Sequence, residues 1–160
     1  MEHKEIKLVI DSELKNVSLV GRTINGLVSM VSPCDISPYD IELCVVEAVN
    51  NCVEHAYGKQ RGHEVEVRFA LGRDRLVVDV CDTGKPMDQR HLAEADVAML
   101  EIDHDDIDGL PEQGRGLPII KEIMDAVIYQ SKGGKNCLSL TKFFGSGEKT
   151  RRCTGGQDGD

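Results

Sequence analysis

The apolar residues of this chain change their spacing between residues 57 and 63, and that change limits which folds the chain can adopt. Between residues 14 and 57 they recur every three or four positions, which is the spacing of an amphipathic helix. Between residues 63 and 82 they alternate with polar residues, which is the spacing of a half-buried strand. Helices of this kind bury their apolar stripe against a sheet, so the pattern predicts a fold with two layers.

Capping and turn signals divide the chain into further elements. Ser37 and Pro38 mark the start of the second helix, and Gly58 marks its end. The other expected elements are strands over 4–10, 63–71, 76–82, 126–129 and 137–144, and helices over 14–31 and 116–124. This order predicts an α/β (α+β) sandwich with helices over one face of a mixed sheet.

Residues 1–144 are expected to form one domain, because a chain of 160 residues can bury a core without metals or disulfides. Residues 84–113 show no sustained period and carry most of the net charge of −9. A long irregular segment inside a compact domain is usually functional, which predicts a lid. Residues 145–160 are rich in glycine and have little to bury, so we expect a disordered tail.

Composition excludes several classes of function. An acidic chain lacks the basic stripe that nucleic acids require. No apolar run is long enough to cross a membrane, and the start does not resemble a signal peptide, which predicts a cytoplasmic protein. The six cysteines form no CxxC pair and mostly lie in apolar runs. We therefore expect reduced core thiols, with neither a disulfide nor a zinc site.

A polar stripe on the second helix is the first candidate for chemistry. Glu47, Asn51 and His55 follow one another at steps of four, so they lie on one side of the helix. The stripe either lines a cleft or is an ordinary solvated edge of an amphipathic helix.

The second candidate is Asp82, at the end of the strand over 76–82. Period two places Asp82 on the same side as Val78 and Val80, so its carboxylate points toward the face that should be buried. It either binds a ligand or bonds the backbone of a strand-terminating turn around Gly84.

The third candidate is the turn of Gly114, Arg115 and Gly116 before an apolar helix. Free backbone N–H groups at a positive helix end can hold phosphate, and glycines allow its close approach. The alternative is a plain turn. The motif is neither a Walker loop nor a Rossmann fingerprint, because no Gly-Lys-Ser/Thr and no third glycine follow.

In this order, the motifs resemble the Bergerat ATP-binding fold of gyrase, ninety-kilodalton heat-shock chaperones, histidine kinases and mismatch-repair ATPases. The chain looks most similar to bacterial anti-sigma-factor serine/threonine kinases. The resemblance covers about residues 4–144 and implies a mostly antiparallel sheet with an ATP lid. It rests on an N box at Val46–Asn51 with His55–Gly58, and on glycine boxes at Asp82–Asp88 and Gly114–Leu117. Pro86 departs from gyrase-like members, which have glycine there.

The resemblance implies roles for individual residues. Asn51 would bind Mg²⁺, Glu47 would be the catalytic base, and Asp82 would accept the adenine amino group. Gly84 would leave room for the ring. The other implied ATP contacts are Gly114, Arg115, Gly116, Leu117 and Thr141. Arg115 either reaches the terminal phosphate or faces solvent.

The resemblance also implies a function. The chain would be an ATP-dependent serine/threonine kinase and anti-sigma factor that phosphorylates an anti-anti-sigma antagonist, binds a sigma factor or comparable target, and forms a homodimer. The alternative is an ATP-binding regulatory module that binds partners without phosphorylating them. The catalytic domain of a histidine kinase is disfavoured, because the chain has no helical hairpin with a phosphoacceptor histidine.

Overall fold

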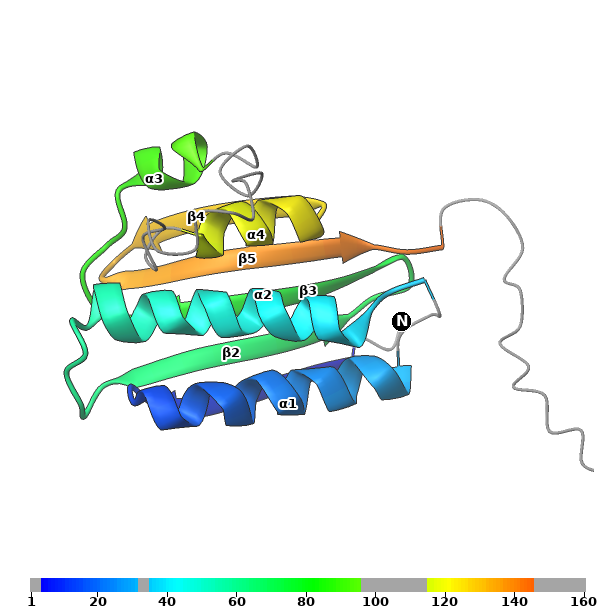
Figure 1. Cartoon of the computed structure of the whole chain (residues 1–160), viewed down its shortest axis with the longest axis horizontal. Coiled ribbons are helices and arrows are strands. Elements are labelled where there is room, and N and C mark those ends of the chain that lie inside the picture. Colours follow the sequence, from blue (N-terminus) through cyan, green and yellow to red (C-terminus); the bar gives the residue numbers. More distant parts are fainter. Residues whose placement is uncertain (1–3, 32–34, 96–114, 146–160) are drawn as a thin grey trace, which may run out of the picture.

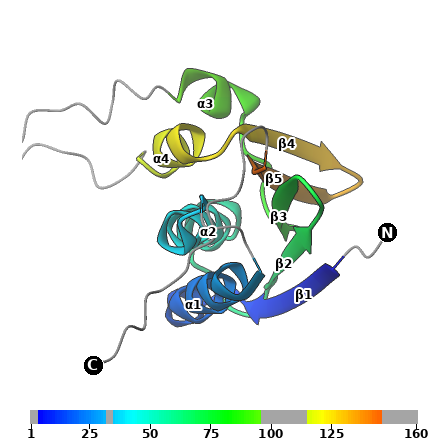
Figure 2. The same ribbon diagram turned by 90° about the vertical axis from the view of Figure 1, so that its right-hand side faces the viewer.

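The computed structural model describes residues 4–31, 35–95 and 115–145. One sheet forms the first layer, and helices cover one of its faces (Figures 1 and 2). The strands are β1 (Lys4–Asp11), β2 (Glu64–Leu71), β3 (Arg75–Asp82), β4 (Ala126–Lys132) and β5 (Lys135–Phe143). The helices are α1 (Leu14–Val31), α2 (Pro38–Asn51), the single π-turn η1 (Cys52–Ala56), α3 (Gln89–Glu94) and α4 (Gly116–Ile123). This is the expected order of elements in a two-layer α/β sandwich.

The strand order is β1-β2-β3-β5-β4, and every neighbouring pair is antiparallel. The expectation of a mixed sheet is therefore wrong. The reason is the place of β5. Strands β3 and β4 run in the same direction, but β5 lies between them and is antiparallel to both.

Helix α2 lies between α1 and α4 and packs over the middle of the sheet (Figure 2). It begins as predicted, with Pro38 in the first turn and the Ser37 hydroxyl accepting the backbone N–H of Asp40 at 3.3 Å. Its buried residues recur every three or four positions, and burial of each large apolar side chain contributes roughly 1.5–3 kcal/mol. They are Ile41, Cys44, Val45, Ala48 and Val49. This packing fixes the helix that carries the polar stripe.

The end of this helical segment differs from the expected regular helix. After Asn51 the backbone widens into the η1 turn, in which the N–H of Tyr57 donates to the carbonyl of Cys52 at 3.0 Å. Gly58 then ends the segment with φ of 57°. The turn leaves the Ala56 carbonyl free to accept the N–H of Lys85 at 2.8 Å, which ties the segment after β3 to the helix. Single π-turns inside helices are frequently found at functional sites.

Part of the expected lid and tail lies outside the described residues, namely 96–113 and 146–160. The described part of the lid contains α3. The Lys121 ammonium of α4 donates to the carbonyls of Leu92 at 3.0 Å and Ala95 at 2.9 Å. These two hydrogen bonds connect the end of α3 to α4. Over residues 4–31, 35–95 and 115–145, no helix has both the length and the apolar character that a membrane span needs.

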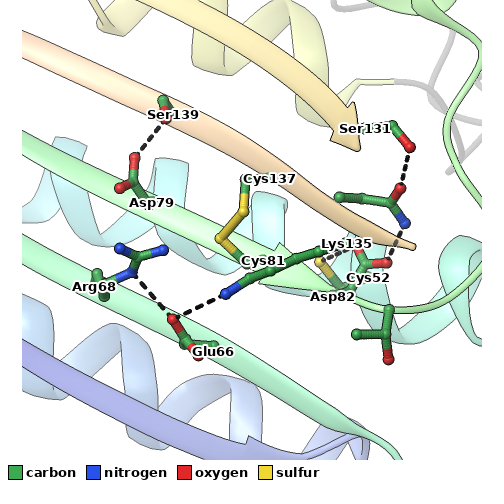
Figure 3. Close-up of a disulfide and its surroundings, with 12 residues drawn as sticks. Cys52, Glu66, Arg68, Asp79, Cys81, Asp82, Ser131, Lys135, Cys137 and Ser139 are labelled. Atoms are coloured by element: carbon green, nitrogen blue, oxygen red, sulfur yellow. Dashed lines mark hydrogen bonds and ion pairs between the residues drawn. A yellow bond between two sulfur atoms is a disulfide. The ribbon is translucent and has the colours of Figure 1, made fainter. Parts of the chain in front are cut away.

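The prediction of reduced thiols is wrong for two of the cysteines. Cys81 and Cys137 form a disulfide, with their Cα atoms 4.1 Å apart (Figure 3). They face each other across β3 and β5, on the face of the sheet that the described helices leave uncovered. The residues are separated by 56 positions, so only the strand pairing brings them together. Cys44 and Cys52 are buried and free, as predicted, and Cys34 and Cys153 lie outside the described residues.

Candidate functional site

A pocket with a volume of about 790 Å³ lies where α2, η1, the end of β3 and the start of α4 meet. Its volume suits a small-molecule ligand. Residues from all three sequence motifs lie at this place. Its lining includes Asn51, Cys52, His55, Asp82, Lys85, Met87, His91, Gly116, Leu117, Tyr129 and Leu138. The polar stripe of α2 therefore lines a cleft over part of its length.

Asp82 lines the pocket and is 8% exposed. Its Oδ1 atom accepts the backbone N–H of Gly84 at 2.9 Å, so the strand-terminating turn is present. Its Oδ2 atom accepts the Cys52 thiol at 3.3 Å. Burial, and secondarily the Asp82 carboxylate, raise the pKa of the Cys52 thiol well above its ordinary value, which keeps the proton that this bond needs. The same carboxylate thus closes the turn and lines the pocket.

Gly84 is required by a contact with the η1 turn. A Cβ atom at this position would lie 2.4 Å from the carbonyl oxygen of Ala56 and 2.9 Å from the ring of Tyr57. The sequence-based reason for this glycine was room for an adenine ring. The structure adds a second reason, which is a close approach between two backbone segments next to the Lys85 hydrogen bond.

Gly84→Ala should lower the free energy of unfolding by roughly 1–3 kcal/mol, the usual cost of overpacking a tight site. Gly26→Ala is the matched control, because nothing lies within 4 Å of a Cβ at Gly26 in the middle of α1. The control should gain about 0.5–1 kcal/mol from helix propensity. Urea unfolding measures both, and equal stability of the two variants would contradict the contact.

Glu47 and Gly116 meet at the edge of the pocket. A Cβ atom at Gly116 would lie 2.7 Å from Oε2 of Glu47, so the carboxylate occupies the space that the glycine leaves free. This position is at the first turn of α4, where helix N–H groups favour negative charge. Burial raises the pKa of Glu47, and the charge of Glu54 raises it further. Raised carboxyl pKa values in a cleft are typical of groups that accept and release protons.

Asn51 lies on the pocket wall one helical turn after Glu47. In the part of the chain that the structure describes, no three His, Cys, Asp or Glu side chains gather closely enough to hold a metal ion. A hard cation that takes one amide oxygen from Asn51 and its other ligands from phosphates and water fits this donor set. Of the other predicted contacts, Leu117 lines the pocket, Arg115 is the residue that precedes α4, and Gly114 lies outside the described residues.

The structure does not bring Thr141 to the pocket. Thr141 pairs with Val77 on the uncovered face of the sheet, and it is absent from the pocket lining. Asn136, on the same strand, is the residue that faces Asp82. Period two along β5 explains the difference, because residues 136 and 141 lie on opposite faces.

Several polar residues of the site were missed by sequence reasoning. Asn136 donates to Asp82 Oδ1 at 2.8 Å, and the Tyr129 hydroxyl accepts the N–H of Met87 at 2.8 Å. The glycine pair between β4 and β5 is a local signal for a hairpin turn. That turn sets the register in which Ser131 pairs with Asn136. Nothing local indicates that this hairpin reaches Asp82.

Comparisons with known proteins agree with this geometry. Residues 10–142 match the family described as histidine kinase-like ATPase domain, and this span contains the three motifs. The serine-protein kinase RsbW of Bacillus velezensis is 33% identical over 144 residues, which cover 90% of this chain and 88% of that protein. The RsbW of Bacillus subtilis is 30% identical with the same coverage. The RsbW of Bacillus licheniformis is 33% identical over 128 residues, or 80% of this chain and 78% of that protein.

Proposed function

We propose that this chain, which belongs to the family of histidine kinase-like ATPase domains, is an ATP-dependent serine/threonine protein kinase that acts as an anti-sigma factor. Its substrate would be an anti-anti-sigma antagonist protein, phosphorylated on serine or threonine, and a homodimer would bind the sigma factor or a comparable target. The relatives named serine-protein kinase support the reaction. The observation that carries the proposal is the Glu47 carboxylate, which lies against Gly116 beside the pocket that Asn51 and Asp82 line.

In the proposed reaction, some residues of the site bind ATP and Mg²⁺, and one residue transfers a proton. ATP with Mg²⁺ supplies the phosphoryl group and neutralises its charge. Asp82 would accept the adenine amino group, and Asn51 would hold the metal through its amide oxygen. The N-terminal turn of α4 would hold the phosphates through its backbone N–H groups. Glu47 takes the proton from the attacking hydroxyl of the protein substrate.

Phosphorylation of a candidate antagonist tests the proposal. The full chain is incubated with γ-labelled ATP, Mg²⁺ and the antagonist, and the modified residue is located by mass spectrometry. Label on an antagonist serine or threonine, lost when that residue is alanine and when EDTA is added, is the expected result. ATP binding without transfer to any antagonist would instead select the regulatory module that binds partners without phosphorylating them.

Asp82→Asn should weaken ATP binding by roughly 1–3 kcal/mol, because the amide presents a donor where the adenine amine needs an acceptor. Inorganic tripolyphosphate should bind as before. Asp79→Asn is the control, since Asp79 lies on the same strand but bonds Ser139 on the opposite face. Calorimetric titration measures both ligands, and an equal loss for ATP and tripolyphosphate would remove Asp82 from the adenine pocket.

A further inference from the structure

Asn136 is a buried amide whose hydrogen-bonding groups all meet partners. It is 1% exposed. Its Nδ2 atom donates to Asp82 Oδ1 at 2.8 Å and to the carbonyl of Gly84 at 3.0 Å. Its Oδ1 atom accepts the Ser131 hydroxyl at 2.7 Å. A carboxylate and a carbonyl only accept hydrogen bonds, so these partners fix which end of the amide faces Asp82.

These contacts make the two oxygens of Asp82 unequal. Oδ1 accepts two N–H donors, from Gly84 and from Asn136. Among the described residues, Oδ2 accepts only the thiol of Cys52, at 3.3 Å, and a thiol is a weak donor. The remaining acceptor capacity of the carboxylate is therefore concentrated on Oδ2.

The torsion that sets this arrangement is a soft one. The terminal torsion of an aspartate has broad minima, so a carboxylate without fixed partners samples a range of rotations. The Gly84 bond comes from the same turn as Asp82 itself. The Asn136 bond comes from another strand, and Ser131 connects it further to β4. The carboxylate is thus held by three strands, β3, β5 and β4.

We propose that Asn136 is a positioning residue that makes the pocket selective for a nucleobase with an exocyclic amino group over one with a carbonyl at that place. Asn136 occupies Oδ1 and fixes the rotation of the carboxylate, so that Oδ2 is offered to the amine. The inference rests on the proposed function, because it takes Asp82 as the adenine contact. It adds the residue that makes this contact discriminate between bases.

The test compares ATP with inosine triphosphate, which carries a carbonyl in place of the amino group. Calorimetric titration of the full chain with Mg²⁺ gives the ratio of the two dissociation constants. Asn136→Ala should lower the preference for ATP about tenfold, the effect of one misplaced buried hydrogen bond. Tripolyphosphate affinity should not change. Ser139→Ala is the control, because Ser139 lies on the same strand and bonds Asp79 on the other face.

A second variant protects the test against a folding defect. Ser131 is exposed, and Ser131→Ala removes only the hydroxyl that orients the Asn136 amide. It should lower the preference by a smaller factor while circular dichroism shows an unchanged fold. An unchanged preference in both variants would overturn the inference and leave the proposed function standing, as would equal losses for ATP, inosine triphosphate and tripolyphosphate. A wild-type chain that binds ATP and inosine triphosphate equally would overturn the adenine assignment, and this inference with it.

Discussion

Glu47→Gln slows phosphoryl transfer by about a hundredfold to ten-thousandfold, the range expected for loss of a general base, and leaves ATP binding nearly unchanged. Glutamine keeps the shape that packs against Gly116 but cannot take a proton. Transfer per bound ATP and the dissociation constant of ATP are measured on one preparation. Glu42→Gln is the control, since Glu42 is on the same helix but binds Asn25 of α1 at 2.7 Å. A collapse of ATP affinity with unchanged transfer would show that Glu47 is not the base.

The raised pKa of Glu47 gives this prediction a pH dependence. The base must be ionised, so transfer in the wild-type chain falls as the pH drops through that raised pKa, and the Glu47→Gln variant loses this limb of the profile. The pH dependence of folding stability has the opposite sign to that of transfer. A carboxyl with a pKa higher in the folded than in the unfolded chain contributes stability below its unfolded pKa, and that contribution is lost as the pH rises. The variant is therefore expected to melt above the wild-type chain at neutral pH.

Breaking the Cys81–Cys137 bond should lower the free energy of unfolding by about 4 kcal/mol, because the bond closes a loop with a sequence separation of 56 in the unfolded chain. For a chain of this size the melting temperature should fall by roughly 8–16 °C. The measurement is thermal unfolding with and without dithiothreitol, after purification without reductant, since disulfides persist mainly under oxidising conditions.

The control for this measurement is a double variant, Cys81→Ala with Cys137→Ala, which carries no bond to reduce. Dithiothreitol should leave its melting temperature unchanged, so any remaining shift would report on other effects of the reagent. Peptide mapping without reductant should recover the linked peptides of wild type. A wild-type chain whose melting temperature is the same in both conditions would contradict a stabilising bond.

The elements of the fold were predictable because their signals are local. The three-and-four spacing over α1 and α2, the Ser37 cap and the alternation in β2 and β3 each act within one element. The order of the strands in the sheet has no such local signal. β4 and β5 form a hairpin that inserts one strand beside β3, and this placement removes the parallel contact that a mixed sheet would need.

The residues of the candidate site were likewise predictable only where their signals are local. Glu47 and Asn51 were identified from spacing along one helix, and Asp82 from its place at the end of a strand. Asn136 and the disulfide depend on the register between β3 and β5, which joins residues more than fifty positions apart. Thr141 was misplaced for the same reason, because choosing the wrong position along β5 also chooses the wrong face.

The disulfide between Cys81 and Cys137 fixes the register of β5 against β3 for the neighbouring residues. Side chains alternate along a strand, so sliding β5 by one position against β3 would replace Asn136 opposite Asp82 with a side chain from the uncovered face. Cys81 precedes Asp82, and Cys137 follows Asn136, so the bond spans the rung directly next to the hydrogen-bonded pair. A covalent link on one face of the sheet thereby preserves the alignment of the polar pair on the other.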